Sequence, residues 1–145
     1  MAFDDQALPR GYPFKTNYEV APRWLADKLA AGDTADLVLV DCRLTYEREF
    51  VSLDPSIHIP LHELEDRRDE IEDAVEDAAA NSGVDAEVVI FCHHGIRSLK
   101  GALTLNALGM PGVKSLAGGL DLWSQAIDPN KPRYDKDGSR CVRID

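Results

Sequence analysis

The 145-residue chain has few cysteines, an acidic rather than basic balance and no long apolar run. Three cysteines, an odd and small number, argue against a disulfide framework and are typical of a reducing compartment. No apolar segment approaches the length of a membrane span, and residues 1–5 lack the basic start and apolar centre of a signal peptide. We therefore expect a cytoplasmic protein without a membrane partner.

Basic side chains are outnumbered, because 16 Lys and Arg face 26 Asp and Glu, which gives a formal net charge of −10. Residues 63–87 hold eleven acidic side chains against two basic ones and so carry most of this charge. Proteins that bind nucleic acid carry basic patches, so the composition argues against a nucleic-acid partner. We interpret the acidic segment as the solvated face of a helix.

The chain also lacks internal repeats, low-complexity tracts, a P-loop and a Gly-x-Gly-x-x-Gly pattern, and we expect no cofactor. Its length and its 44% hydrophobic content suit one domain with its own core. We read residues 1–17 as an irregular lead-in, residues 18–134 as the domain, and residues 135–145 as a C-terminal tail or hairpin.

One strand–loop–helix segment dominates what the chain does contain. The apolar run Val88–Phe91 predicts a buried strand, and residues 99–108, closed by Gly109, predict a helix. Between them Cys92 opens a tight loop in which Gly95 lets the backbone turn inward. Backbone N–H groups converge where a loop enters a helix, so this loop is expected to bind an anion.

Cys92 is the candidate nucleophile of this loop. The positive end of the following helix and the Arg97 guanidinium both favour its thiolate, which is the reactive form of cysteine. A second apolar run, Leu37–Val40, has the continuous character of a strand buried in a parallel sheet. Polar residues follow it, and ligands bind beyond the carboxyl ends of parallel strands. These residues are Asp41, Arg43 and Glu47, which we interpret as supports of the loop.

The cysteine loop resembles the active-site loop of the rhodanese family of sulfurtransferases, whose pattern is Cys-x-x-Gly-x-Arg-Ser/Thr. The matching residues are Cys92, His93, His94, Gly95, Ile96, Arg97 and Ser98. The segment Gly118-Gly119 with Trp123 and the segment Asp41-Cys42-Arg43 also resemble the family, over residues 20–134. The resemblance implies an α/β, three-layer fold: a central, mostly parallel five-stranded sheet with helices on both faces, in which strands 37–40 and 88–91 are neighbours.

The resemblance also implies sulfur transfer in two steps. The Cys92 thiolate takes the sulfane sulfur of a small anionic donor such as thiosulfate and becomes a persulfide, and cyanide or a thiol then accepts that sulfur. A protein is an alternative sulfur acceptor. Loop residues 93–98 would bind the substrate, the N–H groups of residues 93–97 stabilising its charge. Asp41, Arg43 and Glu47 would support them.

Several assignments stay open at this point. Arg97 either contacts the donor anion or fixes the loop through a salt bridge. His93 and His94 are expected to line the loop mouth, and their adjacency to Cys92 does not match the spacing of metal ligands, so we expect no metal. The nature of the donor is open. In the family that the loop resembles, a cationic loop goes with thiosulfate and a small neutral loop with mercaptopyruvate, and two histidines are ambiguous between these. Cys42 is either a small buried hydrophobe or a thiol that resolves the Cys92 persulfide.

Two rival functions are weighed against sulfur transfer. Phosphatases on this fold have five residues between Cys and Arg, whereas four separate Cys92 from Arg97, so a phosphatase is disfavoured. A module that only docks a partner, or that carries persulfide between proteins, is the second rival, and an intact Cys92 weighs against an inert module.

The remaining pattern predicts five further elements. We expect an edge strand at residues 18–20, a helix from Pro22 to Gly32, an amphipathic helix from Leu61 to Ala80, a strand over residues 112–116 and a helix after Gly118-Gly119. The resemblance to the rhodanese family also implies a short strand at residues 56–61.

Overall fold

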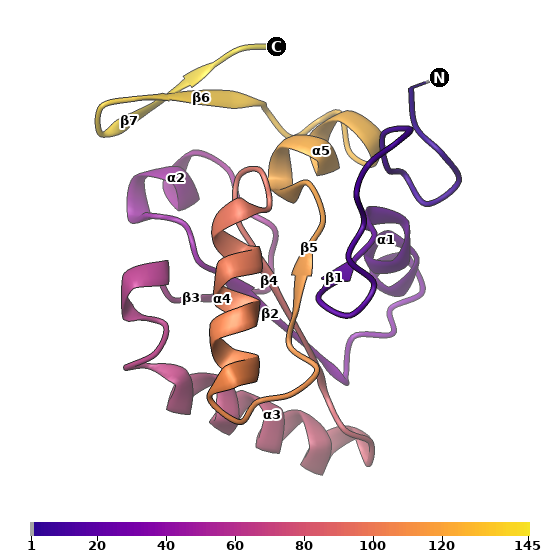
Figure 1. Ribbon diagram of the computed structural model, residues 1–145, viewed down its shortest axis with the longest axis vertical. Helices are drawn as coiled ribbons and strands as arrows, with labels where there is room; N and C mark the ends of the chain where they lie inside the picture. Colours follow the sequence, from indigo (N-terminus) through magenta and orange to yellow (C-terminus); the bar gives the residue numbers. More distant parts are fainter. Residues whose placement is uncertain (1) are drawn as a thin grey trace.

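Five parallel strands form the centre of the molecule in this computed structural model, which describes residues 2–145 (Figure 1). They are β1 (Glu19–Val20), β2 (Leu37–Asp41), β3 (Ile57–His58), β4 (Glu87–Phe91) and β5 (Lys114–Leu116). Their order in the sheet is β1-β5-β4-β2-β3, and every neighbouring pair is parallel. The expected five-stranded sheet is confirmed, and β2 lies beside β4 as expected.

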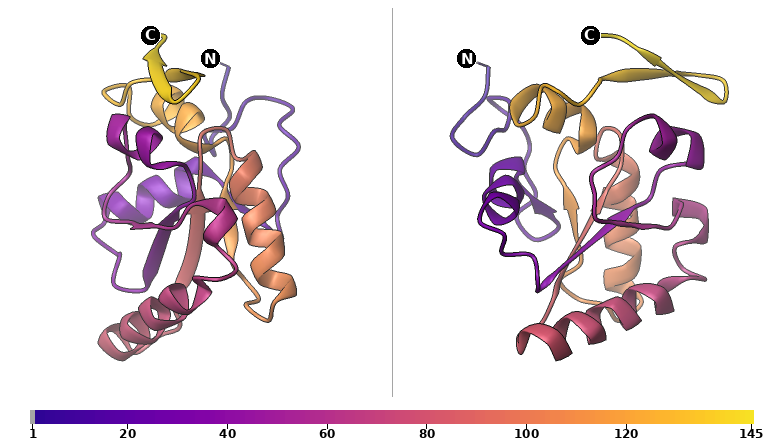
Figure 2. Two further views of the ribbon diagram at one scale, coloured as in Figure 1. Left: turned by 90° about the vertical axis from the view of Figure 1, so that its left-hand side faces the viewer. Right: turned by 180° about the vertical axis from the view of Figure 1, so that it is seen from behind.

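Helices cover both faces of this sheet. They are α1 (Pro22–Ala30), α2 (Thr45–Phe50), α3 (Arg68–Ser82), α4 (Ile96–Ala107) and α5 (Gly119–Ala126), with one 3₁₀ turn, η1 (Leu61–Glu63). Figure 2 shows α1 and α4 on opposite sides of the strands. Alternate residues of a strand point to opposite faces. Accordingly Val40 and Ile90 pack with residues of α3 and α4, whereas Leu39 and Val89 pack with residues of α1 and α5.

The region between β3 and β4 differs from the expected single helix over residues 61–80. The chain instead makes η1, turns, and begins α3 at Arg68. Leu64 is buried in the core and packs against Gly101 of α4. The Arg67 guanidinium donates to the His58 carbonyl at 3.2 Å. These two contacts hold the turn that separates η1 from α3. The seven-residue spacing from Leu64 to Ile71 fits either arrangement, which is why the helical period misled the prediction.

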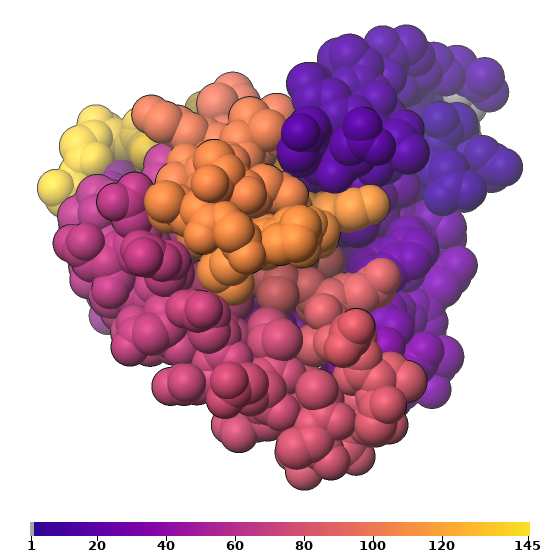
Figure 3. Space-filling view, turned by 60° about the horizontal axis from the view of Figure 1, so that its bottom comes forward, coloured from indigo at the N-terminus to yellow at the C-terminus, as the bar shows by residue number. Residues whose placement is uncertain are grey.

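The acidic side chains of α3 face solvent, as expected for a solvated helix face. All six acids on this helix are exposed, whereas Ile71 is fully buried. Figure 3 looks toward this end of the molecule, where α3 lies at the surface beside α4. Within residues 2–145, no helix combines the length and the apolar character needed to cross a membrane.

The C-terminal residues form a hairpin rather than a loose tail. Strands β6 (Tyr134–Asp137) and β7 (Arg140–Arg143) pair antiparallel as a separate two-stranded sheet. The hairpin lies over the edge of the main sheet at which β4 ends and α4 begins (Figures 1 and 2). Only Tyr134 of β6 is buried, so this residue anchors the hairpin to the domain.

Candidate active site

Cys92 is the first residue after β4, and its sulfur lies inside the turn that leads into α4. Its Sγ atom accepts hydrogen bonds from the backbone N–H of Gly95 at 3.1 Å and of Ser98 at 3.3 Å. Gly95 precedes α4 with φ of +90°, a left-handed conformation that favours glycine. Of the N–H groups expected to converge, those of residues 93–97, Gly95 donates to the cysteine sulfur, and the second donor is the N–H of Ser98, just beyond that range.

The surroundings of Cys92 favour its thiolate. Hydrogen bonding from the Cys42 thiol contributes most, the Ser98 side chain and N–H and the Arg97 charge add to it, and together they outweigh burial and lower the Cys92 pKa to about 5. The thiolate is therefore the main form of Cys92 at neutral pH. Cys92 itself is 1% exposed, so only a small opening reaches its sulfur.

A pair of buried hydroxyls stands behind the sulfur, and sequence reasoning did not identify its second member. Ser98 Oγ lies 3.3 Å from Cys92 Sγ and 2.7 Å from Ser115 Oγ. Ser115 belongs to β5, the strand next to β4, and both serines are fully buried. When the Ser98 hydroxyl donates its proton to the thiolate, the Ser115 hydroxyl donates to Ser98 Oγ and so holds Ser98 in that orientation.

Arg97 is held in a bidentate ion pair with Glu47. Both guanidinium-to-carboxylate distances are 2.8 Å, and the Glu47 side chain is fully buried. Burial alone would raise the Glu47 pKa, but hydrogen bonds from Arg97, Tyr134 and the Leu44 N–H together lower it to about 2. Of the two roles considered for Arg97, the structure contains the salt bridge that fixes the loop.

Asp41 and Arg43 form a second, buried ion pair that is connected to Glu47 through Tyr134. Arg43 is fully buried and bonds Asp41 through Nε and Nη2 at 2.9 and 2.8 Å. Its Nη1 also donates to the Tyr134 hydroxyl at 3.2 Å, and that hydroxyl donates to Glu47 at 2.8 Å. Asp41 and Arg43 therefore contact the loop through Tyr134 and Glu47, not directly.

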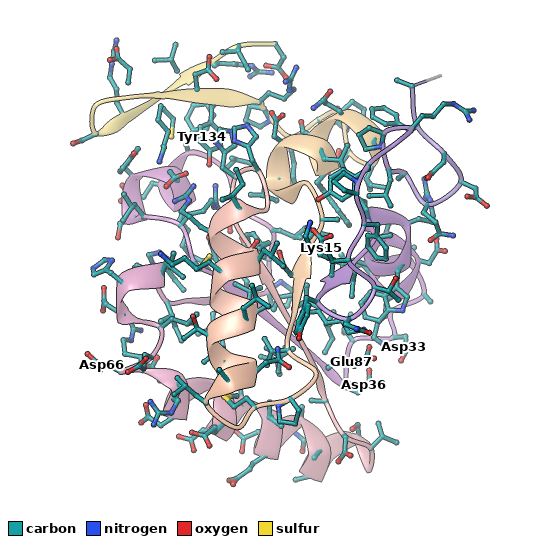
Figure 4. The ribbon with its side chains drawn as sticks, viewed as in Figure 1. Lys15, Asp33, Asp36, Asp66, Glu87 and Tyr134 are labelled. Atoms are coloured by element: carbon teal, nitrogen blue, oxygen red, sulfur yellow. The ribbon has the colours of Figure 1, made fainter. Side chains whose placement is uncertain are left out.

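Tyr134 is a second site residue that the sequence analysis did not identify. Its side chain lies between the hairpin and the body of the domain (Figure 4). The ring stacks on His93 with centroids 3.9 Å apart and planes 7° from parallel. Tyr134 is 87 residues from Glu47 in sequence, so no local pattern marks the contact.

The two loop histidines have different environments. His93 is 5% exposed, and burial, with the nearby His94, lowers its pKa to about 4, so it is neutral at pH 7. His94 is exposed and stacks on His93 at 3.9 Å.

His93, His94 and Asp121 offer ligand atoms within 4.8 Å of one another. The Asp121 carboxylate already accepts a hydrogen bond from the Arg133 guanidinium at 2.9 Å, and His94 Nε2 lies 3.9 Å from the same carboxylate.

The Gly118-Gly119 segment brings the start of α5 into hydrogen-bond contact with the cysteine loop. At the start of α5, the N–H groups of Leu120 and Asp121 bond the carbonyls of Cys92 and His93 at 2.9 and 3.0 Å. Gly119 has φ of +60°, and a Cβ atom on it would lie 2.5 Å from the His93 carbonyl oxygen. Glycine at this position lets α5 approach the cysteine loop closely enough to bind its carbonyls.

Two neighbouring cavities border the site. The first, of about 330 Å³, is lined by loop residues 92–94, 96 and 97 and by Asp135 and Lys136 of the hairpin. The second, of about 620 Å³, contains Cys42, Arg97 and Lys136 among its lining residues. The hairpin therefore supplies part of the rim, or mouth, of the cavity that Cys92 lines.

A parallel sheet with a cysteine held in N–H groups at the end of its central strand defines an α/β domain of the rhodanese type. The family model described as the rhodanese-like domain matches residues 21–126, and the chain belongs to this family. The hairpin lies beyond the matched residues.

Named relatives agree with this assignment. A sulfurtransferase of Allochromatium vinosum is 30% identical over 107 residues, which cover 74% of this chain and 88% of that protein. An adenylyltransferase and sulfurtransferase of Zea mays is 31% identical over 107 residues, so the chain spans about a fifth of that protein's length. A solved rhodanese-related protein of Thermoplasma volcanium has 26% identity and a TM-score of 0.53, covering 69% of this chain and 87% of that one. Sulfur transfer is thus the chemistry supported at the level of the family.

Proposed function

We propose that the chain transfers a sulfane sulfur through a persulfide on Cys92. The observation that carries this proposal is the buried Cys92 thiolate, bonded by the N–H groups of Gly95 and Ser98. Such a thiolate is a ready nucleophile, and the fixed N–H dipoles need no reorganisation when charge shifts to the outer sulfur.

With thiosulfate as donor, the Cys92 thiolate attacks the outer sulfur and forms a new S–S bond. The original S–S bond breaks, sulfite leaves with the electron pair, and Cys92 carries a persulfide. Cyanide or a thiolate then attacks the outer sulfur and restores the Cys92 thiolate. Both leaving groups are stable anions, so no general acid is required.

One positive charge at the mouth, that of Lys136, is available to attract a small anionic donor, and the carboxylate of Asp135 lines the same cavity. Arg97 is neutralised by Glu47, and His93 is neutral at pH 7, so neither brings a free positive charge to the cavity. Lys136 of the hairpin lines the cavity and is exposed. The buried Nε2 atom of His93 has no hydrogen-bond partner among residues 2–145.

A protein acceptor is part of the same proposal. The Zea mays relative is named an adenylyltransferase and sulfurtransferase, and this chain corresponds to about a fifth of it. A persulfide at the mouth of a 330 Å³ cavity would be open to attack by a small thiol or by a thiolate on a flexible protein segment.

The test is the intact mass of the protein after incubation with thiosulfate. We expect the native chain to gain one sulfur, about 32 Da, and to lose it to cyanide, as an activated nucleophile requires. Cys92→Ser should gain nothing, and Cys141→Ser should behave as the native chain. Loading by a protein persulfide but not by thiosulfate would indicate a persulfide carrier, and no loading by any donor would refute sulfur transfer.

A further inference from the structure

Cys42 and Cys92 follow the last paired residues of two neighbouring strands. In the β2–β4 register Asp41 lies opposite Phe91, so the next residues along each strand are the two cysteines. The Cys42 N–H still bonds the Phe91 carbonyl at 3.1 Å, which extends the strand pairing to this point. Neighbouring strands are about 4.8 Å apart, and cysteines bridge when their Cα atoms are about 4.4–6.8 Å apart.

The two thiol groups also share one face of the sheet. Both side chains belong to the core between the sheet and helices α3 and α4, together with Val40 and Ile90. Each is 1% exposed, and both are free cysteines in this structure. Adjacent position and common direction are the two requirements for a bond between the sulfur atoms.

We propose that Cys42 is a resolving thiol, which gives the chain a second outcome: release of the transferred sulfur as hydrosulfide. The proposal rests on the proposed persulfide at Cys92. The Cys42 sulfur attacks Cys92 Sγ, a Cys42–Cys92 disulfide forms, and the bond between Sγ and the outer sulfur breaks. The outer sulfur leaves with the electron pair and takes the Cys42 proton as HS⁻. The two cysteines are oxidised by two electrons, and the sulfane sulfur is reduced by two.

The resting site keeps the proton needed for this step in place. Hydrogen bonding to the Cys92 thiolate, together with burial, raises the Cys42 pKa, so Cys42 holds its proton while Cys92 is ionised. The attacking form is the thiolate, so this proton passes to the departing outer sulfur as the Cys42 sulfur attacks.

A route for the return to the dithiol form is present on the other side of the loop. Cys42 lines the 620 Å³ cavity, whereas Cys92 lines the 330 Å³ cavity, and Arg97 and Lys136 border both. A small dithiol entering the larger cavity would attack the disulfide at Cys42. It would leave as its own disulfide and restore the Cys42 thiol and the Cys92 thiolate.

The experiment follows the persulfide after the donor has been removed. Native protein loaded with thiosulfate is desalted and incubated without acceptor, while hydrosulfide and intact mass are measured over time. We expect one hydrosulfide per chain, and a final mass about 2 Da below that of the reduced protein, the value for one disulfide. Peptide mapping should join the peptides of Cys42 and Cys92, and a dithiol should restore the starting mass.

Cys42→Ser is the decisive variant, because serine keeps a hydroxyl that can donate to the Cys92 thiolate. It should still load with sulfur and transfer it to cyanide, at rates measured separately because Cys42 also supports the Cys92 thiolate. Hydrosulfide release per loaded persulfide should be at least about tenfold slower than in the native chain. Cys141→Ser is the matched control and should release hydrosulfide as the native chain does. A native persulfide that loads but stays intact overturns the resolving role alone. A native chain that neither gains sulfur nor releases hydrosulfide overturns the persulfide proposal as well.

Discussion

Replacing Glu47 with glutamine removes the charge that supports the cysteine loop but keeps the size of the side chain. Glu47 is fully buried and bonds Arg97 twice at 2.8 Å, and it also accepts from Tyr134 at 2.8 Å. The variant leaves the half-buried Arg97 guanidinium without its counter-charge. Removing one partner of a buried ion pair is costly because the other charge stays behind unpaired.

The size of the effect follows from the Glu47 pKa, which is about 2 in the folded protein against an ordinary value of 4.5. Each pKa unit corresponds to about 1.4 kcal/mol, so the ionised carboxylate contributes about 3 kcal/mol to stability at pH 7. The folded pKa is the lower one, so this contribution is complete above pH 4.5 and disappears as the pH falls through about 2. At pH 3 it should have fallen to roughly 1.4 kcal/mol.

Urea unfolding of the native chain and of Glu47→Gln at pH 7 and at pH 3 measures both values. The difference in unfolding free energy should be about 3 kcal/mol at pH 7 and about half of that at pH 3. Glu49→Gln, an exposed residue on the same helix, is the control and should change stability by less than about 0.5 kcal/mol. A Glu47→Gln difference below about 1 kcal/mol at pH 7, or one independent of pH, would refute the reasoning.

Three further outcomes are expected. The rate of Cys92 alkylation should rise with the thiolate fraction, with a midpoint near pH 5. A midpoint close to that of free cysteine would contradict the stabilisation of the thiolate by its hydrogen bonds. Gly119→Ala should lower the thermal midpoint and slow sulfur loading, because its Cβ would lie 2.5 Å from a loop carbonyl; Gly83→Ala, with φ of +79° but nothing within 4 Å, measures the backbone strain alone. Lys136→Glu should raise the KM for thiosulfate without moving the alkylation midpoint, and Arg140→Glu, which does not line the cavity, should leave the KM unchanged in steady-state assays.

The sheet and the cysteine loop could be predicted because their determinants are local. The runs Leu37–Val40 and Val88–Phe91 are apolar without interruption, as strands buried on both faces require, and β2 and β4 contain them. The spacing from Cys92 to Ser98 similarly encodes the turn into α4 within seven residues. Each of these patterns depends on residues that are close in the chain.

The supports of the loop could be predicted only in part, because they are assembled from distant segments. Glu47 was expected near the loop, but its short helix α2 was not, since six residues carry little periodicity. Ser115 and Tyr134 reach the site only through strand order and hairpin placement, and neither stands in a motif. The single helix expected over residues 61–80 was wrong, because the seven-residue spacing from Leu64 to Ile71 fits both one long helix and the observed 3₁₀ turn followed by α3.

The hairpin has a consequence for how the specificity of such a site can be altered. Its strands pair only with each other, and it joins the domain through the buried Tyr134 and through contacts of β7 with α2. The face that borders the cavity, with Asp135 and Lys136, is thus built separately from the sheet and the cysteine loop. The rim is interchangeable: hairpins that keep the tyrosine anchor and vary the other exposed positions would present new entrances to an unchanged sulfur chemistry.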